Sequence, residues 1–152
     1  MDDKDQPFLT LYDQSGHIFR RCGQYSAMAF EEEMGKLGIT PPQFSTLYAI
    51  SLCPGMEQQE IARAIHYDAA TTGAVLARLH KLNAIRREPS GRSARGIAIY
   101  LAPAGEALLQ RALPAIWRNQ VRLLEPLTDE EKPVFLRLLS KAAGVENSFN
   151  RP

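Results

Sequence analysis

Six basic side chains lie close together in the middle of the chain. Residues 78–95 carry a formal charge of +5. The six bases are Arg78, Lys81, Arg86, Arg87, Arg92 and Arg95, and the single acid is Glu88. Such a cluster suits a phosphate backbone, because each phosphate that a Lys or Arg neutralises releases condensed counterions. The stretch therefore predicts a nucleic-acid-binding surface, and the alternative is an ordinary solvated charged loop.

A second set of polar side chains recurs at helical spacing nearer the N-terminus. His17, Arg21 and Gln24 occupy positions i, i+4 and i+7 of one helical stripe, with Arg20 beside it. An arginine fork against an aromatic wall suits a carboxylate carried on a ring. The aromatic residues available for such a wall are Tyr25, Phe44, Tyr48 and Trp117. The alternative is that the arginines pair with acids and that the aromatic side chains belong to the core.

The other reactive side chains form no recognisable catalytic or metal-binding pattern. Cys22 and Cys53 are 31 positions apart, without a CxxC or Cys/His spacing, so we expect neither a zinc site nor a disulfide. The three histidines come with no Gly-rich phosphate loop, GxSxG or HExxH motif. We therefore expect a protein that is not an enzyme and that needs no cofactor or metal.

Helices are expected to position most of these residues. Helical periodicity predicts a long helix over about residues 15–37 and shorter helices over residues 41–52 and about 57–65. Asp68 is a favourable N-cap for a fourth helix. Its inward positions are expected to be Thr72, Val75, Leu76, Leu79 and Leu82. The third and fourth helices are joined by only about four residues, which is typical of a helix-turn-helix.

Beyond residue 82 the period changes from helical to alternating. Ile97, Ile99 and Leu101 alternate with Ala98 and Tyr100, which predicts a half-buried strand. Its partner is expected over residues 85–88, with residues 89–96 as the hairpin loop.

Two further helices are predicted after the hairpin. Pro103 is expected to open a helix that ends near residue 125 and that Pro114 kinks or interrupts. Thr128 and Glu131 form a capping-box pattern for a last helix to about residue 143, although Pro133 then lies rather deep in that helix.

Composition places the chain among globular proteins. It has 152 residues, 45% hydrophobic and 23% charged, which suits one domain. The net charge of +1 alone argues against a nucleic-acid partner. It hides a separation of charge along the chain, because residues 1–37 carry −3 and residues 78–95 carry +5. No apolar run of about 18 residues and no basic leader occurs, so we expect a cytoplasmic protein that does not bind membranes.

The order of these elements resembles a known family. The residues that carry the likeness are 39–44 (Ile-Thr-Pro-Pro-Gln-Phe), 59–63 (Gln-Glu-Ile-Ala-Arg), 68–79, and 101–105 (Leu-Ala-Pro-Ala-Gly) at the end of the hairpin. Over about residues 8–144 the chain resembles the MarR family of dimeric winged helix-turn-helix regulators. The resemblance implies a mainly α fold with a small β-hairpin wing, in a single domain 1–152. Residues 8–37 and 103–144 would be dimerisation helices, and residues 39–102 the DNA-binding lobe.

The resemblance also assigns roles on DNA. The fourth helix would be the recognition helix, and Arg95 matches the wing arginine that the family places in the minor groove. The expected DNA-binding residues are Gln59, Ala69, Ala70, Thr71, Thr72, Gly73, Arg78, Arg87, Arg92 and Arg95. The side chains on the outward face of this helix are unusually small. They are Ala69, Ala70, Gly73, Ala74 and Ala77. Small side chains let a helix lie deep in the major groove, although helix propensity alone also explains alanines.

Two positions depart from the family pattern. The family usually has an acid two positions before the wing arginine, and Ser93 stands there. We therefore expect the family's ion pair between these two wing positions to be absent, which leaves Arg92 or Arg95 freer of protein partners. Ala102 replaces a capping Thr before the fifth helix, which is expected to cost about 1 kcal/mol.

The resemblance implies a repressor on double-stranded DNA. A homodimer would bind a pseudo-palindromic operator with half-sites about one helical turn apart, and a small aromatic acid or phenol would release it. The segment from Leu11 to Glu32 resembles the branch linked to aromatic and heteroaromatic acid catabolism. Expected ligand contacts are His17, Arg20, Arg21, Gln24, Tyr25, Phe44 and Tyr48. The alternatives are a redox-sensing repressor that uses Cys22 and a protein-interaction module on the same fold.

Overall fold

The chain is mainly helical, with one small β-hairpin. The computed structural model describes residues 10–92 and 95–145. A 3-10 turn, η1 (Leu11–Asp13), precedes the long helix α1 (Ser15–Met34), which a second turn, η2 (Gly35–Leu37), extends. Gly38 then reverses the chain in the left-handed conformation, with φ of 64°. The first helix therefore ends where the sequence predicts.

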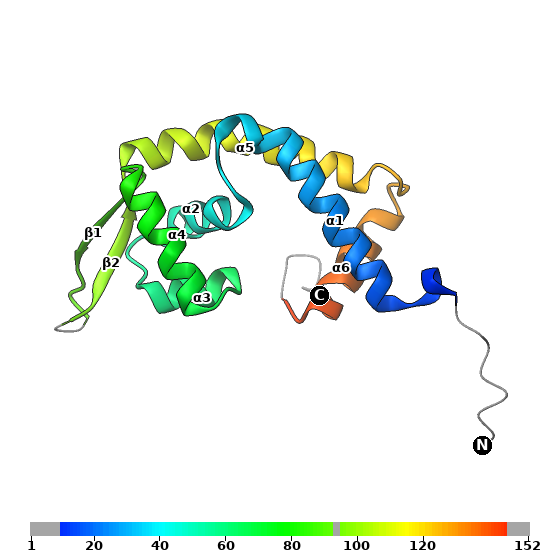
Figure 1. The fold of residues 1–152 in the computed structure, drawn as a ribbon, viewed down its shortest axis with the longest axis horizontal. Coiled ribbons are helices and arrows are strands. Elements are labelled where there is room, and N and C mark those ends of the chain that lie inside the picture. The colour runs from blue at the N-terminus through cyan, green and yellow to red at the C-terminus, as the bar shows by residue number, and fades with distance from the viewer. Residues whose placement is uncertain (1–9, 93–94, 146–152) are drawn as a thin grey trace, which may run out of the picture.

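Three short helices form a compact lobe beneath α5 (Figure 1). They are α2 (Pro41–Leu52), α3 (Gln58–Ile65) and α4 (Ala69–Lys81). Each of the three packs against the other two. Leu47, Ile50, Ile61, Leu76 and Leu79 are fully buried between them, so the apolar stripes predicted from the sequence meet in one core.

The hairpin extends from this lobe. Strand β1 (Ile85–Pro89) pairs antiparallel with β2 (Ile97–Leu101), in the register Ile85 opposite Leu101 and Pro89 opposite Ile97. Ile85 and Ile99 are buried against the helices, while Arg86 and Arg87 remain exposed. The hairpin therefore keeps an apolar base in the lobe and a basic outer part in solvent.

Two helices complete the chain. Helix α5 (Pro103–Leu124) runs from the hairpin end of the lobe to α1, which packs along its second half (Figure 1). Helix α6 (Glu131–Ala143) lies near the N-terminal part of α1. The prediction of a mainly α fold with a β-hairpin wing is confirmed. No helix in the described ranges is long and apolar enough to cross a membrane.

Three local predictions need correction. Leu82 is 50% exposed rather than inward, because α4 ends at Lys81 and the chain turns away at Asn83, whose φ is 53°. Helix α5 continues through Pro114, so the interruption is wrong and only the kink stays a prediction. Thr128 and Glu131 do form the reciprocal bonds of a capping box, but α6 begins only at Glu131. Pro133 therefore lies in the first turn, where no backbone donor is needed.

Candidate nucleic-acid interface

Capping fixes the start of α4. The Asp68 carboxylate accepts hydrogen bonds from the Thr71 backbone N–H at 2.7 Å and from the Thr71 hydroxyl at 2.7 Å. These bonds hold the pKa of Asp68 below its ordinary value. His66 adopts the left-handed conformation at the end of α3, with φ of 55°, so α3 stops abruptly and the turn to α4 is short. The helix-turn-helix proportions predicted from the sequence are confirmed.

The outward face of α4 carries only small side chains along most of its length. Ala69, Ala70, Ala74 and Ala77 are exposed, and Arg78 is exposed near the C-terminal end. Thr71 and Gly73 are half-buried beside α3. The backbone of α4 is therefore accessible to a partner that approaches closely.

The Gln58 side chain of α3 contacts the start of α4. Its side-chain amide donates to the Ala69 carbonyl at 3.1 Å. A Cβ added at Gly73 would lie 3.1 Å from the same amide nitrogen, so the Gln58 side chain would have to shift by a few tenths of an ångström. Gln58 was not among the predicted DNA-binding residues; its neighbour Gln59, which was, is exposed on α3.

Thr72 cannot belong to this surface. Its side chain is fully buried, and its hydroxyl donates to the Asp68 carbonyl at 2.8 Å. Thr72 was predicted both to face inward and to bind DNA. Its complete burial is compatible only with the inward position. We therefore remove Thr72 from the candidate interface.

Basic side chains of the hairpin lie beside this helix. Arg87 and Arg95 are exposed, and among the described residues no acid pairs with either. Arg86 pairs with Glu88 and lies over the Tyr100 ring, with its guanidinium carbon 4.5 Å from the ring centroid. Ser93, where the family pattern has an acid, lies outside the described residues.

Arg92 has protein partners instead of being free. Its Nη1 and Nη2 donate to the two carboxylate oxygens of Glu60 at 2.9 and 3.0 Å, and Nη2 also donates to the Gly55 carbonyl at 2.7 Å. The expectation of greater freedom is therefore wrong for Arg92, and for Arg95, which pairs with no described acid, it stays a prediction. Glu60 is 32 positions away, and no local sequence signal identified it as a partner.

The predicted effector residues fall into two groups that one chain does not bring together. On α1, His17 bonds to Arg20 at 3.2 Å and Arg21 to Gln24 at 3.5 Å, all on an exposed surface. On α2, Phe44 and Tyr48 stack with ring centroids 5.8 Å apart and line a cavity of about 390 Å³. Helix α1 packs on α5 and extends away from α2 (Figure 1).

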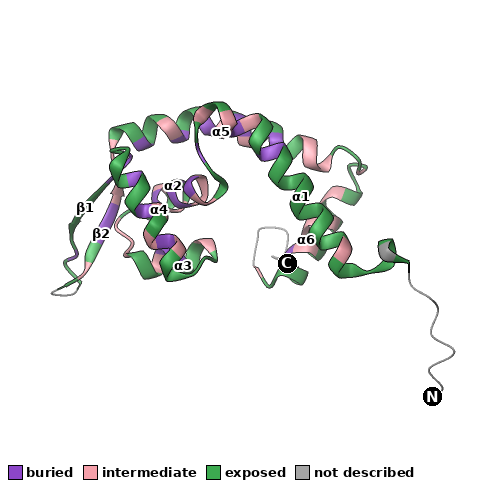
Figure 2. Cartoon of the chain, in the orientation of Figure 1, coloured by how far each residue is buried: buried purple, intermediate pink, exposed green. Residues whose placement is uncertain are grey.

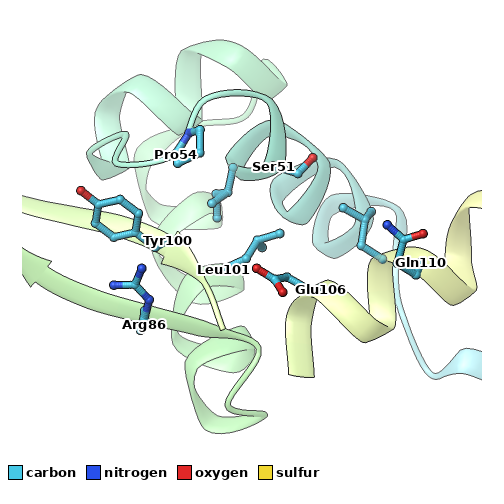
Figure 3. Close-up of a pocket in the computed structure, with 9 residues that line it drawn as sticks. Ser51, Pro54, Arg86, Tyr100, Leu101, Glu106 and Gln110 are labelled. Carbon is cyan, nitrogen blue, oxygen red and sulfur yellow. The ribbon is translucent and has the colours of Figure 1, made fainter. Parts of the chain in front are cut away.

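Another cavity lies where the base of the hairpin meets α2 and α5 (Figure 3). It has a volume of about 290 Å³. Arg86 and Tyr100 line one side, and Glu106 and Gln110 of α5 line another. None of the predicted effector residues lies in this cavity.

The outer faces of α1, α5 and α6 expose large apolar side chains. Phe19 is 51% exposed, Trp117 71% and Val121 56%. Figure 2 shows the N-terminal part of α1 exposed along nearly its whole length. Between the three helices lies a mostly apolar cavity of about 440 Å³, which Cys22 also lines. Both Cys22 and Cys53 are free thiols, and the redox alternative stays a prediction.

Within residues 10–92 and 95–145, no group of three or more His, Cys, Asp or Glu side chains could hold a metal ion.

Comparison with known proteins identifies similar chains. The model of the MarR family matches residues 37–96. The transcriptional regulator HosA of Escherichia coli O157:H7 is 29% identical over 133 residues, 88% of this chain and 97% of that protein. A probable transcriptional regulator from Pseudomonas aeruginosa is 32% identical, with a TM-score of 0.82 over 88% of this chain and 99% of that one.

Two solved complexes are also similar. The transcriptional repressor CouR, bound to a 23-mer DNA duplex, has a TM-score of 0.82 and 26% identity over 90% of this chain and 99% of that one. The Mycobacterium tuberculosis protein Rv2887, in complex with salicylic acid, has a TM-score of 0.67 and 27% identity over 91% of this chain and 98% of that one. The similar proteins are regulators rather than enzymes, as the sequence predicts.

Proposed function

Because the chain belongs to the MarR family of transcriptional regulators, we propose that it is a homodimeric, sequence-specific DNA-binding repressor. One observation carries the proposal: α4, with its exposed small side chains, lies in the same lobe as a hairpin whose exposed Arg87 and Arg95 pair with no described acid. In this proposal α4 enters the major groove, and the hairpin acts as a wing that reaches the adjacent minor groove.

The proposed contacts divide into two kinds. Arg78, Arg87 and Arg95 supply positive charge to phosphates and groove edges. The small side chains on α4 let its backbone approach the bases and place methyl groups against thymine methyls. These residues are Ala69, Ala70, Thr71 and Gly73. Gln59, which is exposed on α3, is a further proposed contact. Because few of them can form bidentate base contacts, DNA shape is expected to contribute much of the specificity.

A second copy of the chain explains the exposed apolar helices. Large apolar side chains on α1, α5 and α6 are about half-exposed or more, including Ile18, Phe19, Met28, Trp117, Val121 and Leu138. Apolar side chains gathered in an exposed patch mark an interface in soluble proteins. We propose that these helices bury it against the same helices of a partner protomer, which would space two α4 helices for a two-fold symmetric operator.

A small aromatic acid is the proposed effector. The polar stripe of His17, Arg20, Arg21 and Gln24 on α1 supplies donors for a carboxylate, and Phe44 and Tyr48 supply a stacked aromatic pair at a cavity. The similarity to a protein in complex with salicylic acid supports this class of ligand. A second protomer can supply the half of the site that a single chain lacks.

Selection of binding sites from random-sequence DNA tests the proposal. Sequencing of the duplexes retained by the wild-type protein is expected to yield a two-fold symmetric motif with half-sites about one helical turn apart. Adding salicylate, a hydroxycinnamate or nicotinate is expected to release the selected duplex. A motif without symmetry would contradict the dimeric arrangement, and no enriched motif would contradict sequence-specific binding.

A further inference from the structure

A groove of about 600 Å³ separates the hairpin from the connection between α2 and α3. It is lined by residues 53–56 and Glu60 on one side and by Pro89, Ser90 and Arg92 on the other. At the base of the hairpin, the two sides are joined by backbone bonds from Gly55 N–H to the Ile99 carbonyl and from Ile99 N–H to the Met56 carbonyl, at 2.9 and 3.0 Å. The base of the hairpin is therefore fixed to the lobe.

Arg92 spans the groove further toward the tip. It makes a bidentate contact with Glu60 and a third bond to the Gly55 carbonyl. The Glu60 side chain is also fixed from the other side. Its carboxylate accepts a hydrogen bond from the Glu57 N–H at 2.7 Å, at the start of α3. Arg92 thereby ties the loop of the hairpin to the helix that precedes α4.

From this geometry we infer that Arg92 and Glu60 form a clamp that positions the wing relative to α4, and that Arg92 is a positioning residue rather than a phosphate contact. The inference rests on the proposed DNA-binding function. Three hydrogen bonds to the protein occupy the guanidinium, and the adjacent carboxylate neutralises its charge. Arg95, three positions further along the loop, pairs with no described acid and is left for the DNA.

The clamp adds a side-chain contact to the outer part of a hairpin whose base is already fixed to the lobe. A two-stranded hairpin is marginally stable alone, so each contact with the lobe helps to define the position of the loop. The Glu60 side chain is 33% exposed and that of Arg92 57%, so the pair is partly solvated. Its loss is therefore expected to weaken DNA binding by a few-fold, up to about fivefold.

Whether Glu60→Gln strengthens or weakens DNA binding shows whether Arg92 positions the wing or contacts phosphates. Glu60→Gln keeps an oxygen for the Glu57 N–H but removes the charge that holds Arg92. If Arg92 acted only through its charge, removing a nearby acid would strengthen binding to DNA, with a steeper dependence on salt. The clamp predicts weaker binding and an unchanged salt slope.

The experiment measures affinity for the selected duplex over a salt series by fluorescence anisotropy. Arg92→Ala is expected to lower affinity without changing the slope of log K against log salt, whereas Arg95→Ala lowers the slope by about 1. The Arg92→Ala, Glu60→Gln double variant is expected to bind no worse than Arg92→Ala alone, because both substitutions break the same contact.

Three outcomes would overturn the clamp while leaving the proposed function intact. They are tighter binding by Glu60→Gln, a lower slope for Arg92→Ala, and wild-type affinity for both variants. Hydrogen exchange without DNA gives an independent test, because amides of residues 85–101 are expected to exchange faster in Arg92→Ala than in wild type. Failure of the wild-type protein to bind DNA would contradict the proposed function itself.

Discussion

The arginines of the basic stretch divide by their partners. Arg86 is held by Glu88 and the Tyr100 ring, and Arg92 by Glu60 and Gly55. Arg78, Arg87 and Arg95 are exposed and pair with no described acid. A formal charge of +5 in the sequence therefore overstates the charge that is available to a phosphate backbone. Only the last group is expected to contribute to counterion release.

Arg95→Ala tests this division. The substitution is expected to weaken binding to the selected duplex on the order of tenfold, about 1.4 kcal/mol, and to lower the salt slope by about 1. Lys36→Ala, at an exposed lysine in η2, is a control that should leave both quantities unchanged. Equal slopes for wild type and Arg95→Ala would exclude Arg95 as a DNA contact.

Arg21→Ala tests the effector proposal. A charge-assisted bond to a carboxylate contributes about 1.5–3 kcal/mol, so the affinity for salicylate should fall at least tenfold in calorimetric titration. Benzyl alcohol, a neutral ring compound, should bind neither protein. If the wild-type protein binds no aromatic acid of the panel, the polar stripe on α1 has another role.

Residue roles were only partly predictable from the sequence. Thr72 satisfies both the inward periodicity and the family pattern for DNA contacts, and only its complete burial decides between them. Arg92 and Glu60 meet across 32 positions, and pairing at this distance in sequence depends on how the hairpin folds back over α3. Periodicity and capping carry no information about such contacts.

At the scale of elements, the best predictions are those with local causes. Helix α2 has the predicted bounds, because Thr40 and Gln43 form a capping box and Pro41 occupies the first position. The hairpin is predicted within one residue, because the change to an alternating period is local. The end of α4 was less predictable, since Leu82 continues the apolar spacing but the helix has already ended.

Helix α5 approaches the lobe so closely at Gly105 that a larger residue there is expected to clash. A Cβ on Gly105 would lie 2.0 Å from the Ala84 carbonyl oxygen, which already accepts a bond from the Ala102 N–H. Gly105→Ala is therefore expected to lower the free energy of unfolding by about 1–3 kcal/mol, measured by chemical denaturation. Gly16→Ala is the control, because nothing lies within 4 Å of its added Cβ. Equal stability of the two variants would contradict the tight junction.

Three carboxylates near the starts of helices are expected to make the free energy of unfolding depend on pH. Hydrogen bonds hold the pKa values of Glu60, Asp68 and Asp129 below their ordinary values of 4.5 for Glu and 3.8 for Asp. A lowered pKa in the folded state means that the stabilisation is complete above the ordinary value and is lost as pH falls through the folded value. The free energy of unfolding should therefore fall as pH is lowered from about 5 toward 3.

Asp68→Asn isolates one of these groups. Asparagine caps a helix about as well as aspartate but does not titrate, so the variant should lose less stability than wild type between pH 5 and pH 3. Denaturation curves recorded across this range compare the two. A steeper loss in Asp68→Asn would contradict the assignment.

At the scale of the whole molecule, the sequence does not show where α1 lies. The polar stripe on α1 and the aromatic pair on α2 each formed as expected, but α1 packs along α5 and carries its stripe away from α2. The exposed apolar side chains of α1, α5 and α6 are the basis of our proposal that a partner protomer completes the fold.

Sedimentation velocity tests that arrangement. At micromolar concentration the protein is expected to sediment as two chains of 17.0 kDa each. Val121→Asp should shift it toward the monomer, because an unpaired charge at an apolar interface is costly to bury. Arg63→Asp, at an exposed position of α3 in the lobe, is the control. A wild-type protein that sediments as a monomer would exclude the two-fold model.

We propose above that α4, with its small exposed side chains, and the basic wing recognise a DNA sequence together. The most direct measurement is the affinity of the wild-type protein for the selected duplex and for a scrambled duplex of the same length, from about 50 to 200 mM salt. We predict tighter binding to the selected duplex throughout, with affinity for both duplexes falling as salt rises. Equal affinity for the two duplexes, or none for either, would contradict the claim.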